Sequence, residues 1–126
     1  MLKIAVCDDD MLFSKKASEM IKKQADMPVK VSCFHSGNDY VKSGCSPDIL
    51  FLDIDMPGIS GWELAKGLKE QGRCPVIIFL TGLSDYVYDA FEVEAAGYLL
   101  KPLEEGKLKK ALDRAVAKVL SDKQDK

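Results

Sequence analysis

The run Ile49-Leu50-Phe51-Leu52-Asp53 decides the fold, because four apolar residues lead directly into a carboxylate. A short apolar run of this kind is typical of a strand buried on both faces of a parallel sheet. Three other apolar runs also end in polar or charged residues: Ile4–Asp9, Val76–Thr81 and Tyr98–Lys101. The carboxyl ends of parallel strands share one edge of a sheet, where open α/β folds bind ligands. We therefore expect three acids, a hydroxyl and an amine to converge on one crevice.

Helical patterns separate these runs. Strands are predicted at 2–7, 29–34, 48–52, 76–80 and 96–100, and helices at 11–25, 38–42, 84–93 and 108–120. A further helix is predicted between a cap at Ser60 or Gly61 and the break at Gly72–Pro75. Five strands alternating with five helices indicate a (βα)5 domain, a flavodoxin-like doubly wound parallel sheet with strand order 2-1-3-4-5. The ligand crevice of such a sheet lies beside its first and third strands. Asp8, Asp9 and Asp53 stand at the ends of those two strands.

The same periodicity assigns individual residues to the core. Asp10 is the expected N-cap of the 11–25 helix. The apolar side of that helix should comprise Leu12, Ala17, Met20 and Ile21. The last helix should bury one face made of Leu108, Ala111, Leu112, Ala115, Val116, Val119 and Leu120. Cys7 and Cys33 lie in strand-like runs and are expected to be small core residues.

Composition narrows the functional classes. A chain of 126 residues with a net charge of −2 fits one domain and has no basic footprint for nucleic acid. The four cysteines include no close C-x-x-C pair, so reduced thiols are expected, and His35 is the single histidine. Neither a signal peptide nor a membrane-spanning stretch is evident, so a cytoplasmic location is predicted. Residues 1–120 should form the domain, with 121–126 as a polar tail or the start of a linker.

The convergent side chains suit phosphoryl chemistry. Neighbouring carboxylates repel one another unless a cation neutralises them, and Mg²⁺ prefers such oxygen ligands. Thr81 and Lys101 are placed to contact phosphoryl oxygens, and Asp53 to act as the nucleophile. Simpler explanations remain open. Asp8-Asp9-Asp10 also fits a solvated capping turn, Lys101 a surface lysine and Thr81 a helix cap.

Five motifs in this order resemble the response-regulator receiver domains of two-component signalling, which are CheY-like. They are Asp8-Asp9, the Asp53–Gly58 run followed by Ser60-Gly61, Thr81-Gly82, Tyr98 and Lys101-Pro102. The resemblance covers residues 3–120. The stretch from Asp85 to Val93, together with Tyr98–Pro102, is similar to receivers joined to LytTR-type DNA-binding domains.

The resemblance implies a role for each residue. Asp53 would accept a phosphoryl group from a histidine kinase, and the domain would catalyse only its own phosphorylation and dephosphorylation. Mg²⁺, which Mn²⁺ could replace, would be bound by Asp9 and Asp53, by Asp8 through water, and by the backbone carbonyl of Asp55. Thr81 and Lys101 would contact the phosphoryl group, and Tyr98 would be the switch aromatic. The Lys101–Pro102 peptide would be cis.

Phosphorylation would then change the surface of residues 84–120. The expected outputs are a homodimer formed through the fourth helix, fifth strand and fifth helix, or control of a LytTR-type DNA-binding domain absent from this chain. Tyr86 and Tyr88 are candidates for that surface, whereas Phe91 is a candidate for the core. The Asp55 carboxylate, two residues past the acceptor, either affects dephosphorylation or is a solvated loop acid.

Two other functional classes remain as alternatives. Asp53-Ile54-Asp55 also resembles the D-x-D motif of haloacid-dehalogenase-type phosphatases, but that scheme gives Asp8-Asp9 no role. The chain also shows no cap insertion for a substrate. The second alternative is a receiver-like interaction module that never accepts phosphate. Turnover of a phosphate ester would favour the first, and failure to bind Mg²⁺ or a phosphoryl mimic would favour the second.

Overall fold

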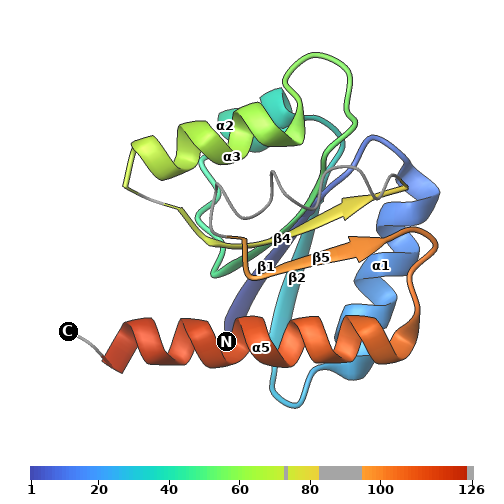
Figure 1. Cartoon of the computed structure of the whole chain (residues 1–126), viewed down its shortest axis with the longest axis vertical. Helices are drawn as coiled ribbons and strands as arrows, with labels where there is room; N and C mark the ends of the chain where they lie inside the picture. The colour runs from blue at the N-terminus through green and yellow to red at the C-terminus, as the bar shows by residue number, and fades with distance from the viewer. Residues whose placement is uncertain (73, 83–94, 125–126) are drawn as a thin grey trace.

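The computed structural model describes residues 1–72, 74–82 and 95–124 (Figure 1). Its strands are β1 (Leu2–Cys7), β2 (Val29–Phe34), β3 (Ile49–Asp53), β4 (Val76–Thr81) and β5 (Gly97–Leu100). They form one sheet of order β2-β1-β3-β4-β5, and every neighbouring pair is parallel. The predicted sheet is therefore confirmed. The helix predicted at 84–93 lies outside the described residues.

Within the described ranges, four helices accompany the strands: α1 (Met11–Gln24), α2 (Gly37–Ser43), α3 (Gly61–Glu70) and α5 (Glu105–Gln124). Side chains cap three of them at the N-terminus. Asp10 accepts from the backbone N–H of Phe13 at 3.1 Å, which confirms the predicted cap of α1. Ser36 and Ser60 cap α2 and α3 in the same way. Each cap satisfies a backbone donor that the helix itself cannot pair.

The sheet separates two apolar layers. Alternate strand residues point to opposite faces, so each strand contributes to both layers. On one face, Ile4, Phe51 and Ile78 pack with α1 and α5; on the other, Leu50, Leu52 and Phe79 pack with α2 and α3. Figure 1 shows the two helix pairs on either side of the sheet. The double cover explains why β3 and β4 are buried along their whole length.

Three core assignments were wrong. Leu12 is 75% exposed, because α1 buries Ser14, Ala17, Ser18 and Ile21, and Leu12 lies about 200° around the helix from Ser14. Leu120 is 48% exposed because it stands 100° beyond the buried Val119. Cys33 is exposed, since β2 is an edge strand and the adjacent part of α1 presents the small residue Ser14. Cys7 is buried, as expected.

Helix α5 extends to Gln124 and includes residues that were predicted as a polar tail. Its first half is tied to the end of α1. Lys109 Nζ donates to the Gln24 carbonyl at 3.0 Å and pairs with Asp26 at 2.6 Å and Asp113 at 3.1 Å.

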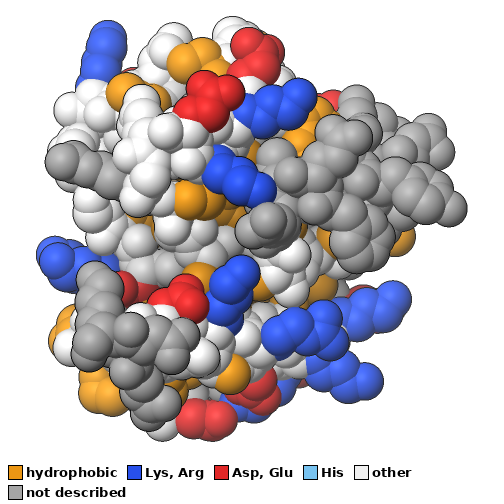
Figure 2. All heavy atoms as spheres, turned by 60° about the vertical axis from the view of Figure 1, so that its left-hand side comes forward, with side chains coloured by type: hydrophobic (Ala, Val, Ile, Leu, Met, Phe, Trp, Pro, Cys, Tyr) orange, Lys and Arg blue, Asp and Glu red, His pale blue; other side chains and the backbone are white. Residues whose placement is uncertain are grey.

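Figure 2 shows one face of the molecule, on which cationic and anionic side chains alternate with small hydrophobic patches.

Candidate phosphoacceptor site

Three carboxylates meet at the carboxyl ends of β1 and β3. Asp8 and Asp9 directly follow β1, and Asp53 is the last residue of β3, which pairs with β1 up to Cys7 and Leu52. One carboxylate oxygen from each acid lies within 4.8 Å of the others. Asp8 and Asp53 are buried, whereas Asp9 is exposed. The neighbouring strands thus bring together the acids that the sequence singled out.

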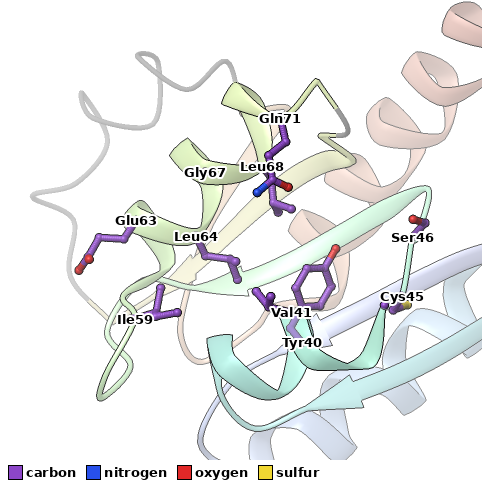
Figure 3. Close-up of a pocket in the computed structure, with 11 residues that line it drawn as sticks. Tyr40, Val41, Cys45, Ser46, Ile59, Glu63, Leu64, Gly67, Leu68 and Gln71 are labelled. Atoms are coloured by element: carbon purple, nitrogen blue, oxygen red, sulfur yellow. The ribbon is translucent and has the colours of Figure 1, made fainter.

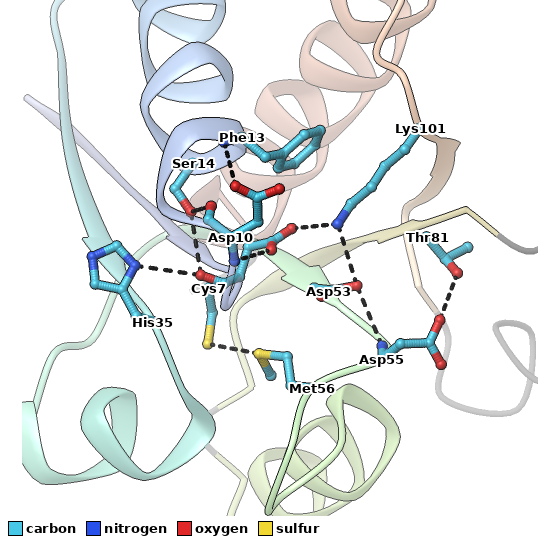
Figure 4. Close-up of polar contacts among 11 residues, drawn as sticks. Cys7, Asp10, Phe13, Ser14, His35, Asp53, Asp55, Met56, Thr81 and Lys101 are labelled. Atoms are coloured by element: carbon cyan, nitrogen blue, oxygen red, sulfur yellow. Dashed lines mark hydrogen bonds and ion pairs between the residues drawn. The ribbon is translucent and has the colours of Figure 1, made fainter.

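Lys101 supplies the positive charge among these acids. It follows β5, and its Nζ lies 2.7 Å from Asp8 Oδ2 and 3.7 Å from Asp53 Oδ1 (Figure 4). Burial opposes the charge of the amine, but its hydrogen bond to Asp8 and the attraction of Asp53 outweigh that effect and raise the Lys101 pKa. Lys101 therefore remains an ammonium ion and bridges two strand ends.

The ring of Phe13 holds Lys101 from the other side. Its centroid lies 4.3 Å from Lys101 Nζ, within the range of a cation–π contact. Phe13 belongs to the first turn of α1, which Asp10 caps. The sequence prediction missed this residue, because Phe13 and Lys101 are 88 residues apart in the chain and no local signal indicates their contact.

The surroundings of Asp53 disfavour the ionised form of its carboxyl group. Burial of the carboxyl and the nearby Asp8 carboxylate raise its pKa from 3.8 to about 7, although Lys101 and the Asp55 backbone N–H favour the ionised form. Burial and the same acids raise the pKa of the Cys7 thiol to about 12, so Cys7 is an inert core thiol. In the absence of a further cation, the cleft carries more negative charge than its surroundings stabilise.

Asp8 is fixed by a dense set of contacts. Its Oδ1 accepts from the Asp10 N–H at 2.9 Å, and its backbone carbonyl accepts from the Ser14 hydroxyl at 3.3 Å. The ring nitrogen Nδ1 of His35 lies 3.4 Å from the same carbonyl. His35, which follows β2, thus lies against the backbone at the end of β1. The consequence is a carboxylate whose position is set by β1, α1 and the β2–α2 connection.

Thr81 and Asp55 are in direct contact beside the acid cluster. Thr81 is the last residue of β4, and its hydroxyl donates to Asp55 Oδ2 at 3.2 Å (Figure 4). The backbone N–H of Asp55 donates to Asp53 Oδ1 at 3.3 Å. The side chain of Asp55 therefore engages the hydroxyl that was predicted to contact a phosphoryl group. Neither the periodicity nor the motif indicated this contact.

The loop after Asp53 is shaped by close backbone approaches. The Gly61 N–H donates to the Ile54 carbonyl at 3.0 Å, and a Cβ on Gly61 would lie 2.3 Å from the Asp53 carbonyl oxygen. Gly58 has φ +79°, in the left-handed region that favours glycine. Only glycine fits at position 61, and the start of α3 is consequently packed directly against the end of β3.

Two further predictions concern β5 and the residues after it. Tyr98 lies on β5, is half-buried and packs against the apolar layer beneath α2 and α3. The Lys101–Pro102 peptide is cis, which confirms the expectation drawn from the resemblance.

A fold of this topology, with these residues at its strand ends, belongs to a defined class. The sequence matches the response regulator receiver domain over residues 4–113, and the chain belongs to that family. It is a receiver domain of two-component signalling. This assignment removes the basis for the phosphatase alternative. Among the described residues, no helix is both long and apolar enough to cross a membrane.

Two curated relatives show the sequence similarity in detail. The transcriptional regulatory protein BtsR of Escherichia coli K12 is 39% identical over 116 residues, covering 90% of this chain and 48% of BtsR. The sensory transduction protein LytT of Bacillus subtilis 168 is 34% identical over 116 residues, again covering 90% of this chain and 48% of LytT. The presence of LytT agrees with the predicted likeness to LytTR-type regulators. The chain thus spans about half the length of the curated relatives it matches.

Solved structures agree with the fold. The response regulatory domain of mrkE from Klebsiella pneumoniae superposes with a TM-score of 0.84 at 28% identity, covering 95% of this chain and 99% of that domain. The response regulator DrrB of Thermotoga maritima, an OmpR/PhoB homologue, gives a TM-score of 0.81 at 32% identity. That match covers 94% of this chain and 54% of DrrB.

Proposed function

We propose that this domain accepts a phosphoryl group on Asp53 from a histidine kinase and uses it to control an output. The observation that carries the proposal is the juxtaposition of Asp8, Asp9 and Asp53 within 4.8 Å, with Lys101 bridging two of them. A carboxylate that ends a buried strand beside a fixed ammonium is suited to attack phosphorus. Surrounding charges then neutralise the transferred group.

The step is a substitution at phosphorus. An oxygen of the Asp53 carboxylate bonds to the phosphorus of a phosphohistidine, and the P–N bond breaks. The imidazole nitrogen leaves with the electron pair and takes a proton from solvent. Lys101 would move from Asp8 toward the new phosphoryl oxygens, and Thr81 would exchange Asp55 for the same group. Hydrolysis reverses the state when water attacks phosphorus and releases inorganic phosphate.

The acid cluster fits a divalent cation. Its donors are hard oxygens, and burial of the carboxyl, together with the nearby Asp8 carboxylate, raises the pKa of Asp53, an effect that a bound cation would oppose. We infer that Asp9, Asp53 and the Asp55 carbonyl would bind Mg²⁺, with Asp8 acting through water, and that Mn²⁺ would substitute. Bound there, the ion supplies positive charge that lowers the repulsion between Asp53 and an incoming phosphoryl group.

The output is proposed from the likeness to BtsR and LytT. Tyr98 would be the switch aromatic, turning inward when Thr81 moves, and the surface within residues 84–120 would then change its partner preference. A homodimer or a LytTR-type DNA-binding domain outside this chain is the expected partner. A cytoplasmic location follows from the same reasoning, because BtsR is a transcriptional regulatory protein.

The decisive experiment is intact mass after incubation with acetyl phosphate, with and without Mg²⁺. One added phosphoryl group is expected only with the ion, and none in Asp53→Asn. Acetyl phosphate consumption, followed in parallel, detects an adduct that hydrolyses quickly. If neither an adduct nor consumption of the donor is found, the domain is an interaction module with a receiver fold.

A further inference from the structure

A second cavity lies away from the acidic cleft, between α2 and α3. Its volume is about 340 Å³, within the range of small-molecule sites in proteins. The walls are mainly apolar, and the principal side chains are Val41, Ile59, Leu64 and Leu68 (Figure 3). None of the carboxylates at the strand ends lines it. The cavity is therefore a separate feature of the fold.

One polar group is aimed into this cavity. Tyr40 is only 3% exposed, and its ring packs edge-on against Phe34 with centroids 5.4 Å apart. Figure 3 shows its hydroxyl pointing across the cavity toward α3. Within the described residues, that hydroxyl makes no hydrogen bond. Burial raises the pKa of Tyr40, so the group stays a neutral O–H donor.

The ring of Tyr40 is buried, whereas its hydroxyl borders the cavity and can donate one hydrogen bond to a molecule bound there. The surrounding walls offer apolar contact on several sides, while the Tyr40 hydroxyl offers one directional bond. Gln71 contributes an amide at the end of α3, near the rim of the cavity (Figure 3). This combination of apolar walls and one fixed polar group is typical of sites that orient small ligands.

We propose that the cavity between α2 and α3 binds a compact, largely apolar molecule whose single hydrogen-bond acceptor takes the proton of the Tyr40 hydroxyl. The bound molecule would fill the space between Val41, Leu64 and Leu68. The proposal is independent of phosphorylation, because no group of the acidic cleft contributes to it.

Gly67 provides a way to close the cavity without disturbing the fold. It lines the cavity from α3, and a Cβ built there meets nothing within 4 Å. Gly67→Leu would place its side chain in the cavity and also improve the helix propensity of α3. Gly106→Leu is the matched control, because Gly106 lies in α5 and is equally unobstructed. Tyr40→Phe removes the hydroxyl but keeps the ring against Phe34.

The test uses two probes of nearly identical shape, quinoline with an acceptor nitrogen and naphthalene without one. Titration of the whole chain is followed by amide chemical shifts in two-dimensional NMR. We expect shifts at Val41, Gly44, Gly67 and Leu68, with quinoline binding more tightly than naphthalene. Gly67→Leu should weaken the binding of both probes at least tenfold, whereas Gly106→Leu should leave their binding unchanged.

Tyr40→Phe separates the hydrogen bond from the apolar contact. This substitution should weaken the binding of quinoline about fivefold, the usual effect of losing one neutral hydrogen bond, and leave the binding of naphthalene unchanged. Equal binding of the two probes to the parent protein would overturn the role of Tyr40. Shifts confined to other surfaces, or binding that survives Gly67→Leu, would overturn the site itself.

Discussion

Opposing effects set the pKa of Asp53: burial and Asp8 raise it, whereas Lys101 and the Asp55 backbone N–H lower it. Its folded-state pKa of about 7 exceeds the ordinary 3.8, so between these values the folded protein keeps a proton that the unfolded chain has lost. Stability of the metal-free protein should therefore fall as pH rises from about 4 to 7, and then level off. Asp53→Asn should lack this component and be more stable at pH 8 by on the order of 2 kcal/mol.

Urea unfolding in chelator at pH 5 and pH 8 checks this prediction. The difference between the parent and Asp53→Asn isolates the contribution of one carboxyl from all other titrations. Asp122→Asn, which changes an exposed acid on α5, is the control and should match the parent at both values. A stability difference that does not change with pH would contradict the assignment of the raised pKa to Asp53.

Under the proposed function, Asp55 would compete with the phosphoryl group for the hydroxyl of Thr81, which donates to Asp55 in this structure. Thr81 must give up the 3.2 Å bond to Asp55 before it can donate to a phosphoryl oxygen. Asp55→Ala should raise the steady-state phosphorylated fraction, with an equilibrium constant about fivefold higher, as expected for one hydrogen bond. Intact mass at fixed acetyl phosphate measures it. Asp55→Asn keeps an acceptor oxygen, so its phosphorylated fraction should lie between those of the parent and Asp55→Ala. A phosphorylated fraction lower in Asp55→Ala than in the parent would refute the competition.

Phe13 is expected to position Lys101 rather than to take part in the chemistry. Phe13→Leu removes the cation–π contact and should slow phosphorylation by acetyl phosphate about twofold to fivefold. Phe13→Trp should restore the rate, because indole is the stronger partner for a cation. A purely structural role predicts instead that Leu and Trp act through stability alone, which urea unfolding of both variants would reveal.

At the scale of elements, the β3–α3 connection depends on one cap. Ser60 accepts from the Glu63 N–H at 3.2 Å, and its hydroxyl donates to the Glu63 carboxylate at 3.2 Å. Ser60→Ala should lower the free energy of unfolding by about 1 kcal/mol. Ser60→Asp keeps an acceptor at the cap and should recover most of that loss. Ser46→Ala, an exposed loop change, serves as the control in the same denaturation series.

Elements were predictable where one local pattern sufficed. Ile49–Leu52 and Val76–Leu80 are continuous apolar runs, and both became central strands. The exposure of Leu12 was not predictable in the same way, because Ser14 and Ser18, rather than Leu12, face the sheet. Small polar residues can occupy a buried helix face when packing is tight, and hydropathy alone does not register this.

At the scale of the whole molecule, the acids and Lys101 could be predicted as one site because strand topology fixes where strand ends meet. The contact of Phe13 with Lys101 and the bond of Thr81 to Asp55 could not, since each depends on side-chain placement across the assembled fold. The cavity between α2 and α3 is likewise a product of how two helices settle on the sheet. No segment of sequence encodes it locally.

The charge of the cleft predicts a stabilising effect of divalent cations on the entire domain. Once Asp53 is ionised, the three carboxylates and the one ammonium carry a net charge of −2, equal and opposite to that of one divalent ion. Mg²⁺ at ten times its dissociation constant should add about 1.4 kcal/mol of stability. Thermal unfolding measures this, with NaCl of equal ionic strength as the control. Asp9→Asn should reduce the effect, and an equal response to NaCl would contradict specific binding.

The close packing at Gly61 limits which alleles of the gene can encode a functional domain. Its missing side chain leaves room for the Asp53 carbonyl, so the codon for position 61 tolerates no missense change without displacing the backbone of Asp53, the proposed acceptor. A forward screen for loss of signalling should therefore recover alleles at Gly61 alongside those at Asp53. The two classes would share a phenotype, although one removes a reactive group and the other only the space beside it.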